Sequence, residues 1–228
     1  MSLQNEQTLE AYQKTAGQYL ANTIAHDNLD MERAKEKKRE LQDFIKKSFS
    51  SIPVGSKVLE IGSADGENAK YLQELGYDVT ASDIADDFIK AIKSNGLDPI
   101  RFNVLTDEFV DKYFGIFCWR VFVHFTKEDA LKVIKKTYAA LEKNGIFVFN
   151  AMNRETREVD EEWVDFPDEY HMGIDRYYCY YNQDYLDSII SETGYEIVDF
   201  YKEGGEKNNK WLVYVLKKNK WKTCSFLL

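Results

Sequence analysis

Residues 58–66 read Val58-Leu59-Glu60-Ile61-Gly62-Ser63-Ala64-Asp65-Gly66, an apolar run that leads into a loop of small residues. The run predicts a buried strand, and the residues after the loop keep helical spacing as far as Leu75. Open α/β sheets bind ligands at this place, outside the carboxyl end of a strand and ahead of a helix N-terminus. Small residues at positions 62, 64 and 66 let the backbone approach a ligand closely. We therefore expect a ligand-binding loop here.

Short apolar runs alternate with helical segments along the rest of the chain. We predict strands at 57–61, 77–82, 100–104, 115–119, 146–150, 195–201 and 211–216. The last two are joined by a loop too short for a parallel crossover, so they must pair antiparallel. Strands that alternate with helices form a mostly parallel sheet covered on both faces. The predicted fold is α/β, a Rossmann-like doubly wound seven-stranded sheet with an antiparallel C-terminal hairpin, N-terminal helices and a cap insertion at 151–181 rather than another layer.

The charge balance narrows the classes of partner. Lysine and arginine give 30 positive charges against 39 acidic side chains, a net charge of −9. Affinity for phosphate backbones and anionic lipids rests on excess positive charge. We therefore expect no nucleic acid and no membrane among the partners, and the sequence gives no indication of oligomeric state.

The cysteines bear on the cellular compartment. Cys118, Cys179 and Cys224 are widely spaced and form no CxxC pair, which predicts neither a metal site nor a disulfide framework. The polar N-terminus lacks a signal segment, and no apolar run approaches the ~20 residues that cross a bilayer. These features are typical of a soluble, reduced, cytoplasmic protein.

The loop also discriminates between ligands. A dinucleotide fingerprint would need glycine at 62, 64 and 67, whereas this chain has Ala64 and Glu67. A glutamate at a helix N-terminus repels pyrophosphate but is compatible with a ligand that carries a sulfonium and no phosphate. S-adenosylmethionine is therefore favoured over NAD. Asp83 ends the second strand, where an acid binds the two ribose hydroxyls of a nucleoside. Asn103 can bond an adenine amine or simply form a turn, and both interpretations stay open.

Residues 58–66 resemble the first motif of the class I S-adenosylmethionine-dependent methyltransferases, with Ala64 in place of the usual middle glycine. Asp83 lies where the second motif has its acid, and the closing hairpin is typical of the family. The resemblance covers roughly residues 10 to 218 and is closest to small-molecule branches similar to the tellurite-resistance and ubiquinone-pathway methyltransferases. The segments with counterparts there are Tyr12 and Tyr19, Val123-His124-Phe125, and Tyr180-Tyr181. The resemblance implies S-adenosylmethionine as cofactor, with contacts expected at Tyr12, Tyr19, Glu60, Gly62, Ala64, Gly66, Asp83, Ile84, Asn103, Val104 and Trp119.

On this interpretation the chain is one domain, because its length and 44% apolar content suit a single core. Its expected parts are an N-terminal helical lid (1–50), a cofactor-binding core (51–150), a substrate-side insertion (151–181), a last helix with the hairpin (182–218) and a tail (219–228).

Methyl transfer is an in-line displacement at a carbon that the sulfonium already activates, so the protein mainly orients the reactants and excludes water. A general base is needed only for a hydroxyl or ammonium acceptor. Candidates gather after the fourth strand, at Trp119, Arg120 and His124. We expect Arg120 to hold a carboxylate, because a guanidinium ending an apolar strand needs an anion. A salt bridge to an acid of 151–181 is the alternative. His124 is expected to act as base or substrate donor, or else to be a hydrogen-bonded structural residue.

The insertion is rich in aromatic residues, and its composition predicts a lid or a substrate wall. The residues that would form it are Trp163, Phe166, Tyr170, His171, Arg176, Tyr177, Tyr178, Tyr180 and Tyr181. Their alternation predicts that one face only, with Tyr178 and Tyr180, reaches the substrate pocket. Core packing is the alternative for these residues. Tyr12 and Tyr19, on one helical face, indicate either a helix that closes over the cofactor or ordinary docking.

The sequence therefore predicts an S-adenosylmethionine-dependent methyltransferase that acts on a small-molecule acceptor. A non-catalytic S-adenosylmethionine-binding or regulatory module is the alternative. A nicotinamide-dependent oxidoreductase is a further alternative, which Ala64 and Glu67 disfavour.

Overall fold

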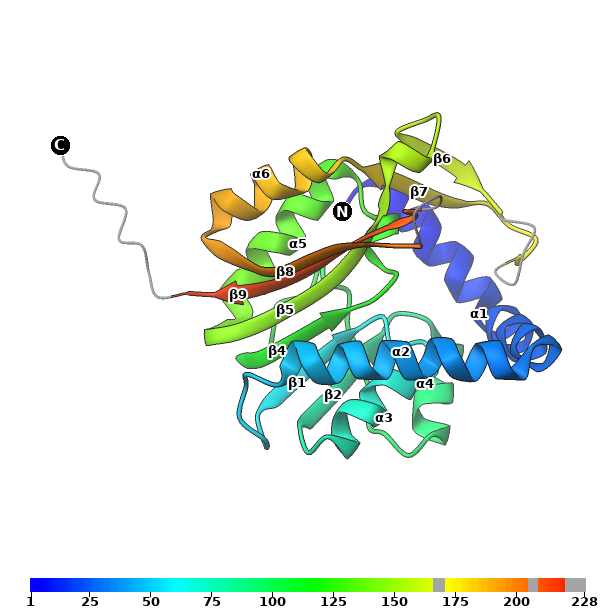
Figure 1. Cartoon of the computed structure of the whole chain (residues 1–228). Helices are drawn as coiled ribbons and strands as arrows, with labels where there is room; N and C mark the ends of the chain where they lie inside the picture. Colours follow the sequence, from blue (N-terminus) through cyan, green and yellow to red (C-terminus); the bar gives the residue numbers. More distant parts are fainter. Residues whose placement is uncertain (166–170, 205–208, 220–228) are drawn as a thin grey trace.

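The computed structural model describes residues 1–165, 171–204 and 209–219. At its centre is a parallel sheet whose strands lie in the order β3-β2-β1-β4-β5 (Figure 1). Their bounds are β1 (Lys57–Ile61), β2 (Asp78–Asp83), β3 (Ile100–Arg101), β4 (Tyr113–Cys118) and β5 (Leu141–Asn153). The parallel order and the strand positions confirm the predicted α/β fold, although β3 ends three residues earlier than expected.

The C-terminal hairpin is confirmed as well. β9 (Trp211–Lys218) pairs antiparallel with β5, and β8 (Tyr195–Glu203) pairs antiparallel with β9. The loop between β8 and β9 spans only seven residues, which forces this antiparallel return.

The insertion differs from its prediction, because it adds strands to the sheet. β6 (Glu161–Val164) and β7 (Arg176–Tyr181) form an antiparallel pair, and β7 runs parallel to the end of β5, with Met152 opposite Tyr180. β5 continues beyond the end of β4, so its last residues need another partner for their backbone groups, and β7 supplies it. In the described residues the sheet therefore has nine strands rather than seven.

Helices cover both faces of the sheet (Figure 1). The six helices of the described chain are α1 (Leu3–Leu29), α2 (Met31–Phe49), α3 (Glu67–Glu74), α4 (Asp86–Ser94), α5 (Lys127–Ala140) and α6 (Gln183–Thr193), with short 3-10 turns η1 (Phe122–His124) and η2 (Arg154–Thr156). One apolar cluster joins α2 and α3 to the sheet through Ile45, Phe49 and Leu72. A larger cluster joins α5 and α6 to the opposite face.

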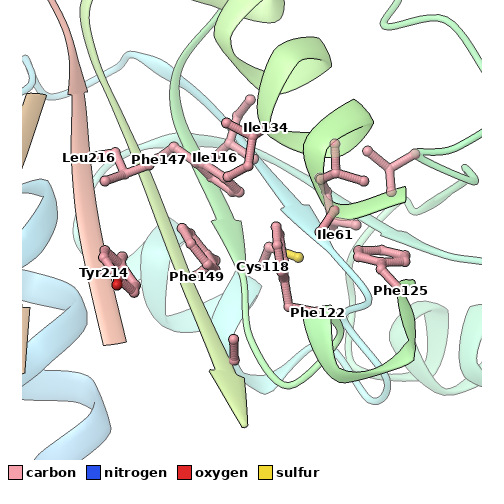
Figure 2. Packing of buried hydrophobic residues seen from close by; sticks show 14 of the residues in the cluster. Ile61, Ile116, Cys118, Phe122, Phe125, Ile134, Phe147, Phe149, Tyr214 and Leu216 are labelled. Carbon is pink, nitrogen blue, oxygen red and sulfur yellow. The ribbon is translucent and has the colours of Figure 1, made fainter. Parts of the chain in front are cut away.

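The larger cluster fixes the turn that follows β4. Phe122 stacks on Phe149 with ring centroids 4.3 Å apart, and Phe125 lies edge-on to Phe122 (Figure 2). Phe149 in turn stacks on Tyr214 of β9 at 5.2 Å. Because Phe122 and Phe125 both pack into this core, η1 is held rigidly at the carboxyl end of the sheet.

Three further features complete the description. No helix of the described residues is long and apolar enough to span a membrane, and these residues contain no cluster of His, Cys, Asp or Glu that could ligate a metal ion. Cys118 and Cys179 are buried free thiols. The tail 220–228 with Cys224, and Phe166 and Tyr170 of the insertion, lie outside the described residues.

The loop between β1 and α3 depends on close packing. Gly62 has φ +75°, and a Cβ built there would lie 2.3 Å from Cγ2 of Val121. Gly66 has φ +85°, and a Cβ there would meet Leu97 at 2.9 Å. Ala64 adopts the left-handed region at φ 48°, which is unusual for a residue with a side chain. Glycine is therefore required at 62 and 66 for internal reasons, before any ligand is considered.

Gly62→Ala should lower the free energy of unfolding by about 2–4 kcal/mol. An alanine is strained in the left-handed backbone conformation of this position, and its Cβ would overlap with Val121. Adding Val121→Ala to this variant should remove the overlap and leave the strain. Urea denaturation of the two single variants and the double variant measures the coupling. Strictly additive losses would contradict the close approach.

Candidate functional site

Glu60 interrupts the apolar residues of β1 as a buried carboxylate, with 1% of its surface exposed. Burial raises the pKa of Glu60 to about 7, and hydrogen bonds from Ser63 and Asn68 oppose the rise. Among the described residues, none donates a hydrogen bond to Glu60 Oε2. A buried carboxylate oxygen without a donor is costly, so this position suits a ligand that brings a cation or an N–H group.

Asp83 is held next to the glycine loop. Its Oδ2 accepts a hydrogen bond from the backbone N–H of Ala64 at 3.0 Å, and its Oδ1 accepts from Ile84 N at 2.7 Å and Ala85 N at 3.3 Å. The carboxylate is 5% exposed, and burial raises its pKa. The structure thus brings together the loop and the acid that the sequence singles out, and the side-chain bonds join the two loops directly.

The N-terminal helix α1 lies over this pair of loops. Tyr12, Tyr19 and Phe88 form a cluster of rings, with centroids 5.6 to 6.3 Å apart, that packs against Ala64 and Ala85. A hydrogen bond of 2.7 Å from Gln13 Nε2 to Asp86 Oδ2 ties α1 to the start of α4. The two tyrosines therefore pack against the predicted cofactor loop from one face of α1.

His124 faces the same helix. Tyr12 Oη lies 2.9 Å from His124 Nε2, and His124 Nδ1 lies 2.8 Å from the backbone carbonyl of Tyr177. A carbonyl oxygen only accepts, so Nδ1 carries the proton and Nε2 accepts from the tyrosine hydroxyl. Burial lowers the pKa of His124 to about 4, which keeps the ring neutral near physiological pH. The site therefore presents a fixed, neutral hydrogen-bond acceptor.

Arg176 belongs to the predicted lid or substrate wall, but the sequence reasoning gave it no role of its own in the site. It begins β7, is 1% exposed, and its Nη1 lies 3.4 Å from the hydroxyl of Tyr12. Its guanidinium carbon lies 5.6 Å from the ring centroids of both Tyr12 and Tyr178. The sequence carried a usable signal, because strand periodicity puts Arg176 on the same face as Tyr178.

The two faces of β7 separate as predicted. Tyr178 lies in a cluster with Val123 and Met152, and its ring is 4.9 Å from that of His124. Tyr177, Cys179 and Tyr181 belong instead to the main core. Tyr180 shares the face of Tyr178, yet its hydroxyl donates to Glu162 and its ring lies under Arg157 at 5.1 Å. Tyr180 also belongs to the cluster of Tyr178, so it packs both against this cluster and against the cap.

Trp119 and Arg120 have other neighbours than His124. Trp119 stacks on Phe117 and approaches Phe44 of α2 at 5.5 Å. Arg120 adopts φ 60°, its backbone N–H donates to Asn150 Oδ1 at 2.6 Å, and its guanidinium lies 5.7 Å from the ring of Trp211. Arg120 is an exposed residue. It therefore lies at the edge of the sheet, beside Trp211.

Asn103 and Val104 lie at the end of β3. Asn103 Oδ1 accepts from Leu105 N at 3.0 Å, and its carbonyl accepts from Thr106 N and Asp107 N. This geometry is that of a turn former. Val104 is buried in the main core, so a ligand can meet only its backbone.

A groove lies on another part of α1. This groove of about 350 Å³ is lined by Gln7, Glu10, Ala11, Lys14, Trp163, Ile174 and Asp175. Helical periodicity places its α1 residues on the face opposite Tyr12 and Tyr19. The groove is therefore separate from the loop and acid described above.

Comparisons with known proteins bear on the family and the fold of the chain. A family profile described as "Methyltransferase domain" matches residues 32–199. A comparison with curated protein sequences found no match.

Several solved structures share the fold. The magnesium protoporphyrin IX methyltransferase from Synechocystis PCC 6803, solved with bound S-adenosylmethionine, is similar with a TM-score of 0.68 and 9% identity, over 96% of this chain and 99% of that chain. An S-adenosylmethionine-dependent methyltransferase from Clostridium acetobutylicum ATCC 824 gives 0.66 and 15%, over 88% and 100%. The N-methyltransferase NodS from Bradyrhizobium japonicum WM9, solved with S-adenosyl-L-homocysteine, gives 0.57 and 16%, over 82% and 88%.

At these identities the solved structures support the fold, whereas the family profile spans more than half of the sequence. The chain therefore belongs to the family of methyltransferase domains.

Proposed function

We propose that this protein transfers a methyl group from S-adenosylmethionine to a small-molecule acceptor by in-line displacement. The observation that carries the proposal is the meeting of the glycine loop, Asp83 and the rings of Tyr12 and Tyr19 at the carboxyl end of the sheet. The family assignment supports methyl transfer, and two of the similar structures hold S-adenosylmethionine or its demethylated product.

The residues present fit this cofactor. Glu60 Oε2 lacks a donor among the described residues and suits the ammonium group of the methionine part. The carboxylate of Asp83 has lone pairs beyond those used by three backbone N–H groups and can accept from ribose hydroxyls. The faces of Tyr12 and Tyr19 suit a sulfonium through cation–π attraction. The further proposed contacts of the cofactor are Gly62, Ala64, Gly66, Ile84, Asn103 and Val104, and Trp119 is proposed to contact it at the edge of the site.

When bound, S-adenosylmethionine supplies an activated methyl group, and the chain's own residues do the rest. His124 Nε2 would accept a hydrogen bond from the nucleophile of the acceptor in place of the Tyr12 hydroxyl. A group with a pKa of about 4 is a weak base, so His124 orients the nucleophile rather than holding its proton. Tyr178, beside His124, would form a wall for the acceptor, with Tyr180 behind it.

The parts of the chain have proposed roles of their own. Residues 1–50 act as a lid, 51–150 hold the cofactor, 151–181 face the acceptor, and 182–218 complete the sheet of a single domain followed by a tail.

Exposed Arg120 contacts a carboxylate of cofactor or acceptor at the edge of the site. The free thiols of Cys118 and Cys179 support a reduced, cytoplasmic location, and the net charge of −9 supports partners other than nucleic acid.

Calorimetric titration should give micromolar binding of S-adenosylmethionine and S-adenosylhomocysteine and no binding of NAD. Asp83→Ala should weaken both affinities by about tenfold or more, because it removes charged hydrogen bonds to the ligand and to the loop. Asp78→Ala, at the exposed opposite end of β2, is the control. Unchanged affinity in Asp83→Ala would remove this residue from the site, and binding of NAD alone would overturn the proposal.

Glu60→Gln should stabilise the protein at pH 8 and weaken its affinity for S-adenosylmethionine. The folded pKa of about 7 lies above the unfolded value of 4.5, so wild type loses stability as pH rises between these values. Glu60→Gln has no carboxylate to ionise, so its free energy of unfolding does not fall in this way. The difference from wild type should be about 1–3 kcal/mol at pH 8 and absent below pH ~4. Denaturation at the two pH values and calorimetry measure both effects. Glu67→Gln, an exposed acid nearby, is the control, and tighter cofactor binding by Glu60→Gln would count against the ammonium contact.

The ring of His124 should stay neutral down to pH ~5, because burial lowers its pKa to about 4. An NMR titration of the imidazole carbon-bound protons tests this, with the resonance assigned by its loss in His124→Gln. Titration of that resonance near pH 6.5 would show an exposed imidazole and contradict the buried contact with Tyr177.

A further inference from the structure

Arg176 places a permanent positive charge inside the protein. Its side chain is 1% exposed, and a guanidinium does not lose its proton at any physiological pH. Keeping such a charge out of water is costly, so its position in the fold calls for an explanation. That position is the wall formed by β7, on the face that also carries Tyr178.

The charge lies beside the groups proposed to hold the acceptor. Nη1 of Arg176 is 3.4 Å from the Tyr12 hydroxyl, which is itself 2.9 Å from His124 Nε2. The guanidinium also faces the ring of Tyr178, which lies edge-on to His124. An acceptor that reaches His124 therefore comes within reach of Arg176.

Asp165 orients this guanidinium through a long contact. The ion pair from Arg176 Nη2 to Asp165 Oδ1 measures 3.5 Å, whereas charge-assisted hydrogen bonds measure about 2.7–2.9 Å. The carboxylate of Asp165 is fixed by its own loop, since it accepts from Met172 N at 2.9 Å and Gly173 N at 2.6 Å. His171 Nδ1 lies 2.9 Å from Oδ2 of Asp165. Asp165 is thus anchored elsewhere and meets Arg176 at a distance.

The charges of the two halves of the site have opposite signs. The buried acids Glu60 and Asp83 lie on the side of the glycine loop, where a cationic cofactor is proposed to bind. On the acceptor side, Arg176 is charged, His124 is neutral and Tyr12 keeps its proton. Burial, helped by Asp83, raises the pKa of the Tyr12 hydroxyl. Asp165 balances part of this charge from its own loop, and Arg176 favours a negatively charged ligand on the side of Tyr12.

We propose that the methyl acceptor is an anion, and that Arg176 determines this specificity by binding its carboxylate or phosphate group. The inference rests on the proposed methyltransferase function and adds the class of acceptor.

The test begins with small molecules from a cell extract, separated by ion exchange into anionic, neutral and cationic fractions. Each fraction is incubated with the full-length protein and S-adenosylmethionine labelled in its methyl group. Labelled product should arise from the anionic fraction. Loss of this product after phosphatase treatment of the fraction identifies a phosphate, and its persistence identifies a carboxylate.

Variants then connect the specificity to Arg176. Arg176→Gln should raise KM for the purified anionic acceptor about 30-fold or more, and leave the affinity for S-adenosylmethionine within about threefold. Arg176→Lys, which keeps the charge, should recover part of the loss. Arg157→Gln, a second arginine of the cap that stacks on Tyr180, should leave KM unchanged. If Arg176→Gln does not fold, competition by inorganic phosphate against the acceptor in the wild type tests the anion site directly.

The outcomes separate the two proposals. Product from the neutral or cationic fraction alone overturns the anionic acceptor while it supports methyl transfer. No product from any fraction, with S-adenosylmethionine bound, overturns the proposed methyltransferase function. An unchanged KM in a folded Arg176→Gln, or no competition by phosphate in the wild type, overturns the role of Arg176.

Discussion

The hydrogen bonds that Asp83 receives from backbone N–H groups are the interaction on which the rest of the site depends. Through them one carboxylate fastens the loop after β1 to the loop after β2. Each bond to a charged group contributes about 1.5–3 kcal/mol, which is enough to hold Ala64 in its left-handed conformation. The surface formed in this way is the one that α1 covers. An acid at this position therefore shapes the cofactor site and offers oxygens to a ligand at the same time.

The site is assembled from three different parts of the chain, each fixed by ordinary packing. Phe122 and Phe125 lock η1 into the core, and His124 lies between them in sequence. β7 reaches its place because β5 extends past the end of β4. Tyr12 joins these parts, since it packs over Ala64 and hydrogen-bonds to His124. The polar groups near the proposed methyl donor thus owe their positions to the sheet rather than to flexible loops.

Most of the sheet could be predicted from local patterns, because strands such as β1 and β4 are continuous apolar runs between helices. β6 and β7 could not, because their pairing depends on the relative lengths of β4 and β5, which no local pattern encodes. At the site, the motif residues Gly62 and Asp83 come together as expected. Arg120 adopts a positive φ after β4 and lies exposed, which the apolar run before it does not indicate. Arg176 could be assigned only to the predicted lid or substrate wall, because no motif gives a charged residue in an aromatic run a role of its own.

The contacts of Tyr12 couple the two halves of the site energetically. Its ring covers the loop proposed for the cofactor, and its hydroxyl occupies the histidine nitrogen proposed for the acceptor. Any ligand that shifts this side chain changes the free energy with which the other ligand binds. By thermodynamic reciprocity, the factor by which cofactor alters acceptor affinity must equal the factor by which acceptor alters cofactor affinity. Through Tyr12, the affinity of each half of the site for its ligand therefore depends on whether the other half is occupied.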